Sequence, residues 1–561
     1  MIRLLFLFTA VIMFIRHTDT NAQNPAILRG PYLNIGTSSS IVVRWRTDTL
    51  AAAVNSRVRY GTQMDTSAMM TVDSANLTFE HEINITGLIA NTKYYYAIGT
   101  SASILSGPDS SMYFQTSPTA GTKQPIRVWA IGDFGEGNAN QAAVRDAYKN
   151  YMNNQHTDVW IWLGDNAYND GYDSEYQTSV FDMYPEIFKK TVLWPAPGNH
   201  DYGSTHPLVS TGGVTYFNNF TMPINGEAGG APSGNEGYYS YNYGNVHFIS
   251  LNSENYTYSG IIPNVVITHS PAMITWLQSD LAANTNKDWI IAYLHAPPYA
   301  NGTHSENYNG IDIFKKLEGI VMRSVRDNIV PILESYGADL FLGGHSHDYE
   351  RSYLIYGNYG TGGPYPPDST VVDGSSGKFS QGTPYTKLTT GPGANKGTVY
   401  AVVGCSAKTG NYTDDGPLTH ELMFTGDYRL GSLMLEINDK RLDAYFIDTS
   451  GSVFDDFTII KDPVTPPSVQ ETDINSRGFK VYPNPFTGQM TVEYTLDKPN
   501  NVLLDIYNLA GQKVHTVVNK YQQEGNYTYT IDADKAGLVK GSYLLEFKID
   551  GISKVRKSIK L

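Results

Sequence analysis

Five apolar runs, each followed at once by polar side chains, constrain the fold of this 561-residue chain more than any other feature. Continuous apolar runs of this length are typical of strands covered on both faces, as in a sheet between helices. The runs and the residues that follow them are 128–132 before Asp133, 159–164 before Asp165, 192–198 before Asn199, 289–294 before His295, and 339–344 before His345. Segments of helical character at 140–155, 272–286 and 312–335 alternate with them, which predicts an α/β core over residues 123–461.

The polar clusters predict a shared site. In α/β sheets, ligands bind beyond the carboxyl ends of the strands, so five strand ends would bring residues from distant parts of the sequence together. Aspartate, asparagine, histidine and tyrosine are suitable ligands for divalent and trivalent metal ions. The set is large enough for two ions, and a carboxylate can bridge a pair about 3.5–4 Å apart, as in two-metal phosphoester hydrolysis.

The segment before the core has a different pattern of apolar and polar residues. Residues 24–118 contain short alternating strands at 41–45, 56–61 and 93–98, with turn residues between them. This pattern predicts a small β-sandwich. The stretch 88–96, with three consecutive tyrosines at its end, resembles the loop and strand of a fibronectin type III domain.

The segment after the core also returns to alternating strands. A proline-rich linker is expected over 462–478, and a second all-β domain over 479–561. Three motifs, at 481–486, 505–511 and 541–543, resemble the C-terminal sorting domain of the type IX secretion pathway. The alternative is a carbohydrate-binding or adhesive β-module. The resemblance implies the type IX secretion machinery as a partner.

The start of the chain and its charge limit where the protein acts. A basic start is followed by an uncharged, mostly apolar stretch at 4–15, which is too short to span a membrane. We therefore expect a signal peptide over 1–22 and a secreted or cell-surface protein with no membrane span.

The charge and the cysteine count exclude further properties. The chain has 40 basic and 54 acidic residues, for a net charge of −14, so nucleic acid is not an expected partner. The single cysteine, Cys405, excludes an internal disulfide.

Taken together, the five clusters resemble those of the calcineurin-like metallophosphoesterases, and specifically the purple acid phosphatases. Two details favour that branch. No histidine stands two residues after Asp133, where Gly135 is found, and Tyr168 lies three residues after Asp165. The sequence 344–352 also continues as in that family. A fibronectin-like domain ahead of the core fits the resemblance as well.

The resemblance implies a role for each residue. The ferric ligands would be Asp133, Asp165, Tyr168 and His347, and the divalent ligands would be Asp165, Asn199, His295 and His345. Asp165 would bridge the two ions, one Fe(III) and the other iron, zinc or manganese. His200 and His304 would face the substrate, and Asp201 would orient His200.

The expected activity is that of an exported acid phosphatase. It would hydrolyse small-molecule phosphomonoesters by attack of a metal-bridging hydroxide. A phosphodiesterase of the same superfamily and a surface adhesion protein with a relic site are the alternatives. A long insertion at 356–397, rich in Gly, Pro, Ser and Thr, is expected at the surface near the site, as a possible rim over the substrate.

Overall fold

The structure is a computed structural model that describes residues 24–203, 214–261, 265–308, 310–360, 370–462, 479–508, 513–549 and 552–560. The chain forms two compact units, residues 1–463 and 464–561, which are described separately. The predicted signal peptide and nearly all of the predicted linker lie outside the described residues. Across the described ranges, no helix is both long and apolar enough to cross a membrane.

The first unit begins with two small antiparallel sheets. The strands of the first sheet, in spatial order, are β1 (Ile27–Asn34), β2 (Ser40–Thr47) and β5 (Glu80–Thr86). Those of the second are β4 (Met70–Thr78), β3 (Val54–Gly61), β6 (Lys93–Gly99) and β7 (Ile104–Ser106), with β8 (Tyr113–Gln115) also paired to β6. The backbone N–H of Ile89 donates to the hydroxyl of Tyr94 at 3.0 Å. This is the tyrosine corner of such sandwiches, and it lies in the stretch that suggested the resemblance.

Two seven-stranded mixed sheets form the core that follows. The first sheet contains, in spatial order, β11 (Leu193–Ala196), β10 (Val159–Leu163), β9 (Ile126–Ile131), β24 (Gly431–Asn438), β25 (Arg441–Asp448), β26 (Val453–Lys461) and β21 (Tyr385–Lys387). The second contains β12 (Tyr239–Tyr243), β13 (Val246–Ser250), β16 (Trp289–Tyr293), β17 (Leu340–Gly343), β22 (Val399–Val403), β18 (Tyr349–Ser352) and β23 (Met423–Asp427).

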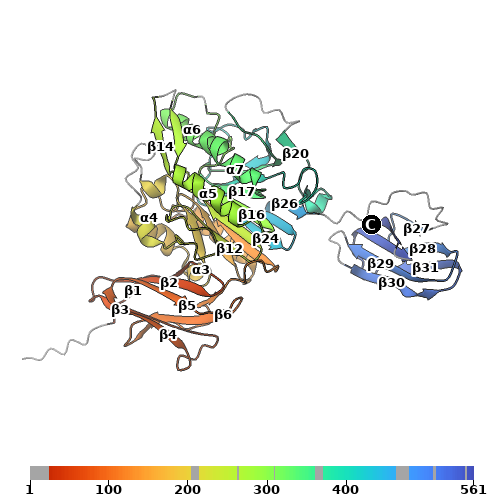
Figure 1. Cartoon of the computed structure of the whole chain (residues 1–561), viewed down its shortest axis with the longest axis horizontal. Coiled ribbons are helices and arrows are strands. Elements are labelled where there is room, and N and C mark those ends of the chain that lie inside the picture. Colours follow the sequence, from red (N-terminus) through yellow and green to blue (C-terminus); the bar gives the residue numbers. More distant parts are fainter. Residues whose placement is uncertain are drawn as a thin grey trace, which may run out of the picture. The chain divides into compact units, whose positions relative to one another are not determined.

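The helices cover the outer faces. Helices α5 (Pro271–Ala283), α6 (Ile313–Asn328) and α7 (Val330–Ser335) lie over the second sheet (Figure 1). Helix α1 (Ala139–Met152) packs on the first sheet, where the indole of Trp129 stacks on Tyr148 at 4.1 Å. The shorter helical elements are α2 (Asp173–Tyr176), η1 (Gln177–Phe181), α3 (Pro185–Phe188), η2 (His200–Tyr202), α4 (Val214–Asn219) and η3 (Phe379–Gln381).

Alternation along the strands explains this layering. In β16 and β17, Ile291 and Leu342 face a cluster shared with the first sheet, whereas Ala292 and Phe341 face the helices. Both faces of these strands are therefore buried, as their continuous apolar runs predicted. The result is the predicted mixed α/β sandwich between all-β domains. Helix α6 begins where the side chain of Asp312 accepts a hydrogen bond from the backbone N–H of Phe314.

The β-sandwich and the core share one hydrophobic cluster. Arg29 of β1 is fully enclosed, lies 3.9 Å from the ring centroid of Phe181, and donates to Asn219 at 2.6 Å. The hydroxyl of Tyr32 donates to the backbone carbonyl of Asn219 at 2.8 Å. These buried contacts fix the sandwich against the core, so the two behave as one unit.

The described part of the 356–397 insertion corrects an expectation. Its strand β21 joins the edge of the first sheet beside β26, and Lys387 binds the carboxylate of Asp339 at 2.8 Å. Asp339 immediately precedes β17, so this part of the insertion lies at the amino ends of the parallel strands. The predicted metal ligands follow the carboxyl ends. This portion is therefore not a rim over the substrate; the strand pairing and the ion pair hold it elsewhere.

The remaining strands of the first unit form two hairpins. They are β14 (Tyr256–Ser259) with β15 (Val266–His269), and β19 (Leu354–Ile355) with β20 (Val371–Asp373).

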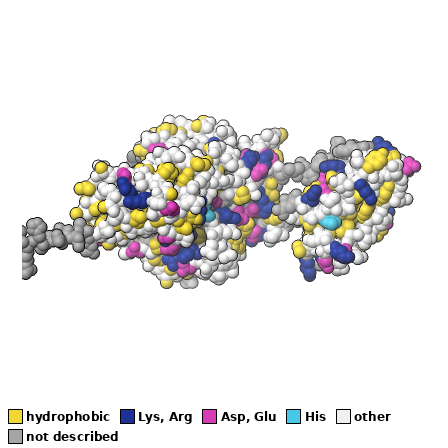
Figure 2. Space-filling model, turned by 90° about the horizontal axis from the view of Figure 1, so that it is seen from below, with side chains coloured by type: hydrophobic (Ala, Val, Ile, Leu, Met, Phe, Trp, Pro, Cys, Tyr) yellow, Lys and Arg dark blue, Asp and Glu magenta, His cyan; other side chains and the backbone are white. Residues whose placement is uncertain are grey.

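The surface charge is mixed. The face in Figure 2 shows Lys and Arg side chains beside Asp and Glu side chains rather than in one large patch.

The second unit is an all-β domain of two sheets, as predicted. One sheet contains β27 (Lys480–Tyr482), β28 (Gln489–Leu496) and β31 (Gly525–Asp532), and the other β30 (Lys513–Gln522), β29 (Asn500–Asn508), β32 (Gly541–Ile549) and β33 (Ile552–Lys560). Alternate residues of β28, such as Met490 and Val492, are buried in a core with Leu504 and Phe547.

Candidate metal centre

The predicted ligands come from strand ends of both sheets. Asp133 and Asp165 follow β9 and β10, which are parallel neighbours in the first sheet. His295 and His345 follow β16 and β17, which are parallel neighbours in the second. Gly164 permits the two sheets to meet here, because a β-carbon at this position would lie 2.6 Å from Nδ1 of His295.

The backbone at these strand ends is unusual. Asp133, Asp165 and His345 have φ angles of 53°, 51° and 66°, in the left-handed region that side chains other than glycine rarely adopt. Such strain persists where the surrounding structure imposes it, and it clusters at functional sites. Here the conformation turns three donor side chains toward one point.

One group of donors gathers around Nε2 of His295. This nitrogen lies 3.3 Å from Oδ1 of Asp165, 3.0 Å from Oδ1 of Asn199 and 3.2 Å from Nδ1 of His345. The other ring nitrogen, Nδ1, lies 2.9 Å from the carbonyl oxygen of Leu163, which holds the ring in place. These four side chains are the predicted divalent ligands.

A second group gathers around the hydroxyl of Tyr168. Its oxygen lies 3.0 Å from Oδ1 of Asp133 and 2.9 Å from Oδ2 of Asp165, and its single proton can be donated to either. Nε2 of His347 lies 3.6 Å from Oδ1 of Asp133. These four side chains are the predicted ferric ligands.

Asp165 belongs to both groups through different oxygen atoms. Oδ1 faces His295 and Oδ2 faces Tyr168. The residue is 2% exposed. A carboxylate that turns one oxygen to each of two donor groups has the arrangement needed to bridge two ions.

The buried carboxylates and histidines of the centre shift one another's pKa values. Burial alone would raise the pKa of Asp165, but the charges of His295 and His200 hold it well below its usual range. Burial opposes protonation of His295, yet Asp165 and Asp133 raise its pKa. Burial, together with the charges of His304 and His295, lowers the pKa of His345 far below its usual value and leaves its ring available as a neutral ligand.

The donor set therefore fits metal ions. Ligand atoms of Asp133, Asp165 and His295 lie within 4.8 Å of one another, and all three residues are buried. Among the described residues, no lysine or arginine forms an ion pair with either aspartate. Buried carboxylates normally need a positive partner, and bound cations would supply it.

His200 lies at the edge of the centre. Its backbone N–H donates to Oδ1 of Asp165 at 2.9 Å, and its ring lies 4.6 Å from that of Tyr168. Its Nδ1 lies 2.6 Å from the carbonyl oxygen of Asn169. With 30% of the side chain exposed, the ring can meet a substrate beside the ligands.

His304 lies on the other side. Its ring is 4.2 Å from that of His345, and its Nδ1 is 2.7 Å from Oε2 of Glu318 on α6. The structure thus brings both predicted substrate histidines to the centre. Ligand atoms of His304, Glu318 and His345 also lie within 4.8 Å of one another.

Asp201 makes contacts other than those expected. Its carboxylate accepts hydrogen bonds from the backbone N–H of Gly198 at 2.7 Å, from Nδ2 of Asn166 at 2.9 Å, and from the hydroxyl of Tyr176. No hydrogen bond among those described joins it to the ring of His200. Burial raises the pKa of Asp201 to about 7. This residue ties together the loops that carry Asp165 and Asn199.

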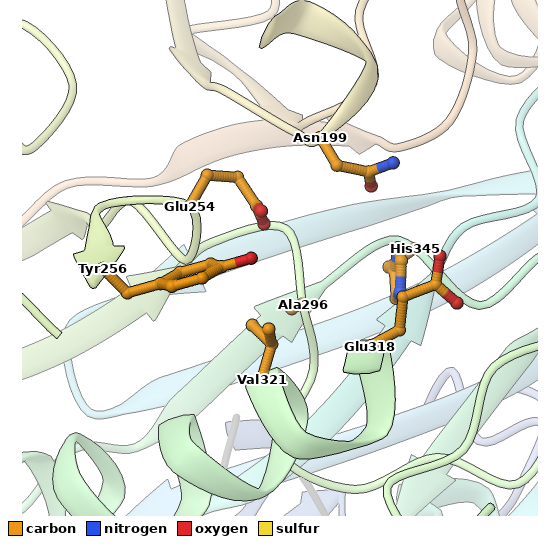
Figure 3. A pocket seen from close by; sticks show the side chains of 7 residues that line it. All are labelled: Asn199, Glu254, Tyr256, Ala296, Glu318, Val321 and His345. Atoms are coloured by element: carbon orange, nitrogen blue, oxygen red, sulfur yellow. The ribbon is translucent and has the colours of Figure 1, made fainter. Parts of the chain in front are cut away.

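A pocket adjoins the predicted ligands of the divalent ion (Figure 3). Glu254 and Tyr256 point into it from one side, opposite Asn199 and His345, while Val321 and Glu318 come from α6. The sequence analysis missed Glu254, Tyr256 and Glu318. Glu254 lies in a turn, Tyr256 begins β14 and Glu318 lies on α6, so no local pattern marked them, and only the tertiary fold brings them to the site.

Comparisons with known proteins agree with this geometry. Residues 126–349 match the calcineurin-like phosphoesterase family, residues 29–123 the purple acid phosphatase N-terminal domain, and residues 480–561 the secretion system C-terminal sorting domain. The chain therefore contains a calcineurin-like metallophosphoesterase domain. A purple acid phosphatase N-terminal domain precedes it, and a C-terminal sorting domain follows it.

Individual relatives are distant. Purple acid phosphatase 15 of Arabidopsis thaliana is 25% identical over 304 residues, which cover 50% of each chain. Purple acid phosphatase 22 of the same plant is 28% identical over 280 residues, or 50% of this chain and 55% of the relative. The chain thus spans about half the length of these relatives. A purple acid phosphatase from yellow lupin (Lupinus luteus) seeds has the same fold, with a TM-score of 0.57 and 19% identity over 79% of this chain and 76% of that one.

Proposed function

We propose that the protein is an exported phosphatase that hydrolyses small-molecule phosphomonoesters with two metal ions. The observation that carries the proposal is the placement of Asp165, whose two carboxylate oxygens face two different groups of donors. A bridging carboxylate between two such groups is typical of two-metal phosphoester hydrolysis. The relatives named purple acid phosphatases support the same conclusion.

The proposed ligands divide by chemistry. Asp133, Tyr168 and His347 would join Asp165 around Fe(III), because hard anionic oxygens favour a trivalent ion. The neutral donors of the other group would hold iron, zinc or manganese; they are Asn199, His295 and His345. When bound, the two ions supply Lewis acidity that neutralises charge on the phosphate and activates water for attack.

The residues around the ligands bind and orient the substrate. His200 would contact a phosphate oxygen or give a proton to the departing alcohol, since its ring is exposed beside Tyr168. His304 would act from the opposite side, with Glu318 fixing its ring through Nδ1. We assign Asp201 to holding the loops of Asp165 and Asn199 rather than to orienting His200, because its hydrogen bonds run to those loops.

The monoester preference is tested by comparing p-nitrophenyl phosphate with bis(p-nitrophenyl) phosphate across a range of pH. The proposal expects a higher kcat/KM for the monoester and an optimum in mild acid. A preference for the diester would favour the alternative phosphodiesterase. Absence of turnover with both, in protein that contains two metal ions per chain, would overturn the proposed monoesterase activity.

Export is proposed from the end of the chain. The sorting domain over 480–561 supports secretion through the type IX machinery to the cell surface or the medium. A signal peptide at 1–22 would direct the first step. We place the domain limits at 24–118, 123–461 and 479–561, with a linker at 462–478. Sequencing of the N-terminus of the exported protein, with its intact mass, tests the signal peptide and removal of the sorting domain together.

A further inference from the structure

A sixth strand end reaches the metal centre. Strand β22 is parallel to its neighbour β17, so both carboxyl ends open at the same edge of the sheet. The loop that follows β22, residues 404–408, contains no carboxylate or histidine, and it gave no sign of a ligand in the sequence. It ends at Lys408.

The loop is fixed against the loop that follows β9. The backbone N–H of Ser406 donates to the carbonyl of Gly132 at 3.2 Å. The side-chain amide of Asn138 donates to the carbonyl of Ala407 at 3.2 Å. The backbone immediately before Lys408 is therefore held beside Asp133 by contacts on both sides.

The ammonium group of Lys408 lies over the face of Tyr168. Its Nζ is 3.3 Å from the centroid of the phenol ring and 3.0 Å from Oε1 of Glu136. Lys408 is 27% exposed in its side chain, and Tyr168 is 6% exposed overall. A cation this close to an aromatic face is attracted to it, and partial burial strengthens the attraction.

We propose that Lys408 is a positioning and tuning residue for Tyr168, whose ammonium group lowers the electron-donor strength of the phenolate toward the ferric ion. This inference rests on the proposed function, because it requires Tyr168 to be a ligand of Fe(III). The ammonium acts through the ring of Tyr168. Glu136 opposes it with the negative charge of its carboxylate, whose Oε1 lies 3.0 Å from the ammonium nitrogen.

The test is the visible spectrum of the iron-loaded protein. A phenolate bound to Fe(III) gives a charge-transfer band whose energy falls when the phenolate becomes a better donor. Lys408→Met removes the positive charge from the ring, so we expect the band to move to longer wavelength. The shift should be on the order of 10 nm, the size expected if the energy of the band changes by about the strength of one cation–π interaction. Glu136→Gln should move it in the opposite direction.

Two variants serve as controls. Lys408→Arg keeps a cation at the ring and should leave the band close to its original position. Lys93→Met removes a lysine that lies 3.7 Å from the ring centroid of Tyr113, a similar pair within the N-terminal sandwich. It should not change the spectrum. Metal content is measured for each protein, so that a shift is not confused with loss of iron.

The outcomes distinguish the proposed role of Lys408 from the proposed binding of Fe(III) by Tyr168. A band that is present in the original protein and unmoved in Lys408→Met, with iron content unchanged, would overturn the role of Lys408 and leave the proposed function intact. Iron bound without any band in the original protein would overturn the ferric assignment of Tyr168, and this inference with it. A shift of equal size in Lys93→Met would show a nonspecific effect and would also overturn the inference.

Discussion

Buried carboxylates near the two ends of strand β17 have different kinds of partner. At the amino end, Asp339 is fully buried and binds two lysines, Lys387 at 2.8 Å and Lys461 at 2.7 Å. At the carboxyl end, Asp133 and Asp165 are equally buried, but their ionisable neighbours are histidines and a tyrosine.

The difference separates a structural carboxylate from a proposed metal ligand. Asp339 is neutralised within the chain, and its environment has no need of a further cation. Burial lowers the pKa of Lys387 to about 8, which indicates how strongly this end of the sheet is closed to water. Among the described residues, Asp133 and Asp165 form no ion pair with a lysine or arginine. Their ionisable partners are histidines, which can bind metal ions when neutral, so bound ions would supply the fixed positive charge.

The largest expected effect comes from removing the carboxylate shared by the two donor groups. Asp165→Ala takes a ligand from both proposed ions, so turnover of p-nitrophenyl phosphate should fall more than about 1,000-fold, beyond the loss of a single hydrogen-bond donor. Steady-state kinetics with metal in the buffer measure the loss. Activity within tenfold of the original would contradict the bridging role.

The next effect separates a substrate residue from a ligand. His200→Ala should lower kcat by about 10²–10⁴, the usual contribution of a general acid or base, while both ions remain bound. Because the ring is partly exposed, added imidazole should restore part of the rate. Loss of metal from this variant would show instead that His200 belongs to the centre itself.

At the opposite end of β17, the expected effect is on stability. Asp339→Asn leaves Lys387 and Lys461 without their shared counter-charge, and breaking a buried pair in this way costs about 3–5 kcal/mol of unfolding free energy. Denaturant titration measures the change. Asp73→Asn is the control, because its salt bridge with Arg57 is largely exposed and should contribute less than about 1 kcal/mol.

Metal content gives this variant a second readout. Asp339→Asn should still bind both ions, since it lies at the far end of the strand. A variant that unfolds no more easily than the original would remove the proposed contrast between the two ends.

The smallest effect concerns a buried histidine whose pKa is shifted by burial and by no described ion pair. His81 is stacked on Trp45 at 4.7 Å and hydrogen-bonded to Ser56 at 2.8 Å, and burial lowers its pKa to about 4. The unfolded chain binds this proton near pH 6.5, so stability is lost as pH falls from about 6.5 to 4. Between pH 7 and 5 the loss is about 2 kcal/mol.

His81→Gln should remove that part of the pH dependence. Unfolding titrations at pH 7 and pH 5 measure it, and His515→Gln in the second unit is the control. An unchanged pH dependence in His81→Gln would contradict the neutral, buried state of the ring. His295, whose pKa the carboxylates raise, shows that a histidine at the metal centre behaves in the opposite way.

The sequence predicted the strands and the positions of the proposed ligands because both were marked locally. The apolar run before Asp165 forms β10 at 159–163, and its last residues turn the carboxylate into the site. Helix 312–335 was only partly right: it is divided into α6 and α7, and Pro331 stands in the first turn of α7, where a proline is tolerated.

Residues without a local mark escaped prediction. Glu318 is one carboxylate on a helix, and Lys408 is one lysine in a loop. Only the packing of α6 and of the loop after β22 places them beside His304 and Tyr168, and the sequence does not reveal that packing. The insertion at 356–397 was misplaced for a related reason. Composition identified a loop-rich segment, but the pairing of β21 with β26, which the sequence does not reveal, decided where its described part lies.

Metal analysis of the purified protein tests the central claim most directly. Elemental analysis of the original protein and of Asp165→Ala and Asp339→Asn, loaded in parallel, compares the two ends of β17 in one experiment. We predict about two ions per chain, including iron, in the original protein and in Asp339→Asn, and loss of both in Asp165→Ala. Full metal retention by Asp165→Ala, in folded protein, would contradict the account.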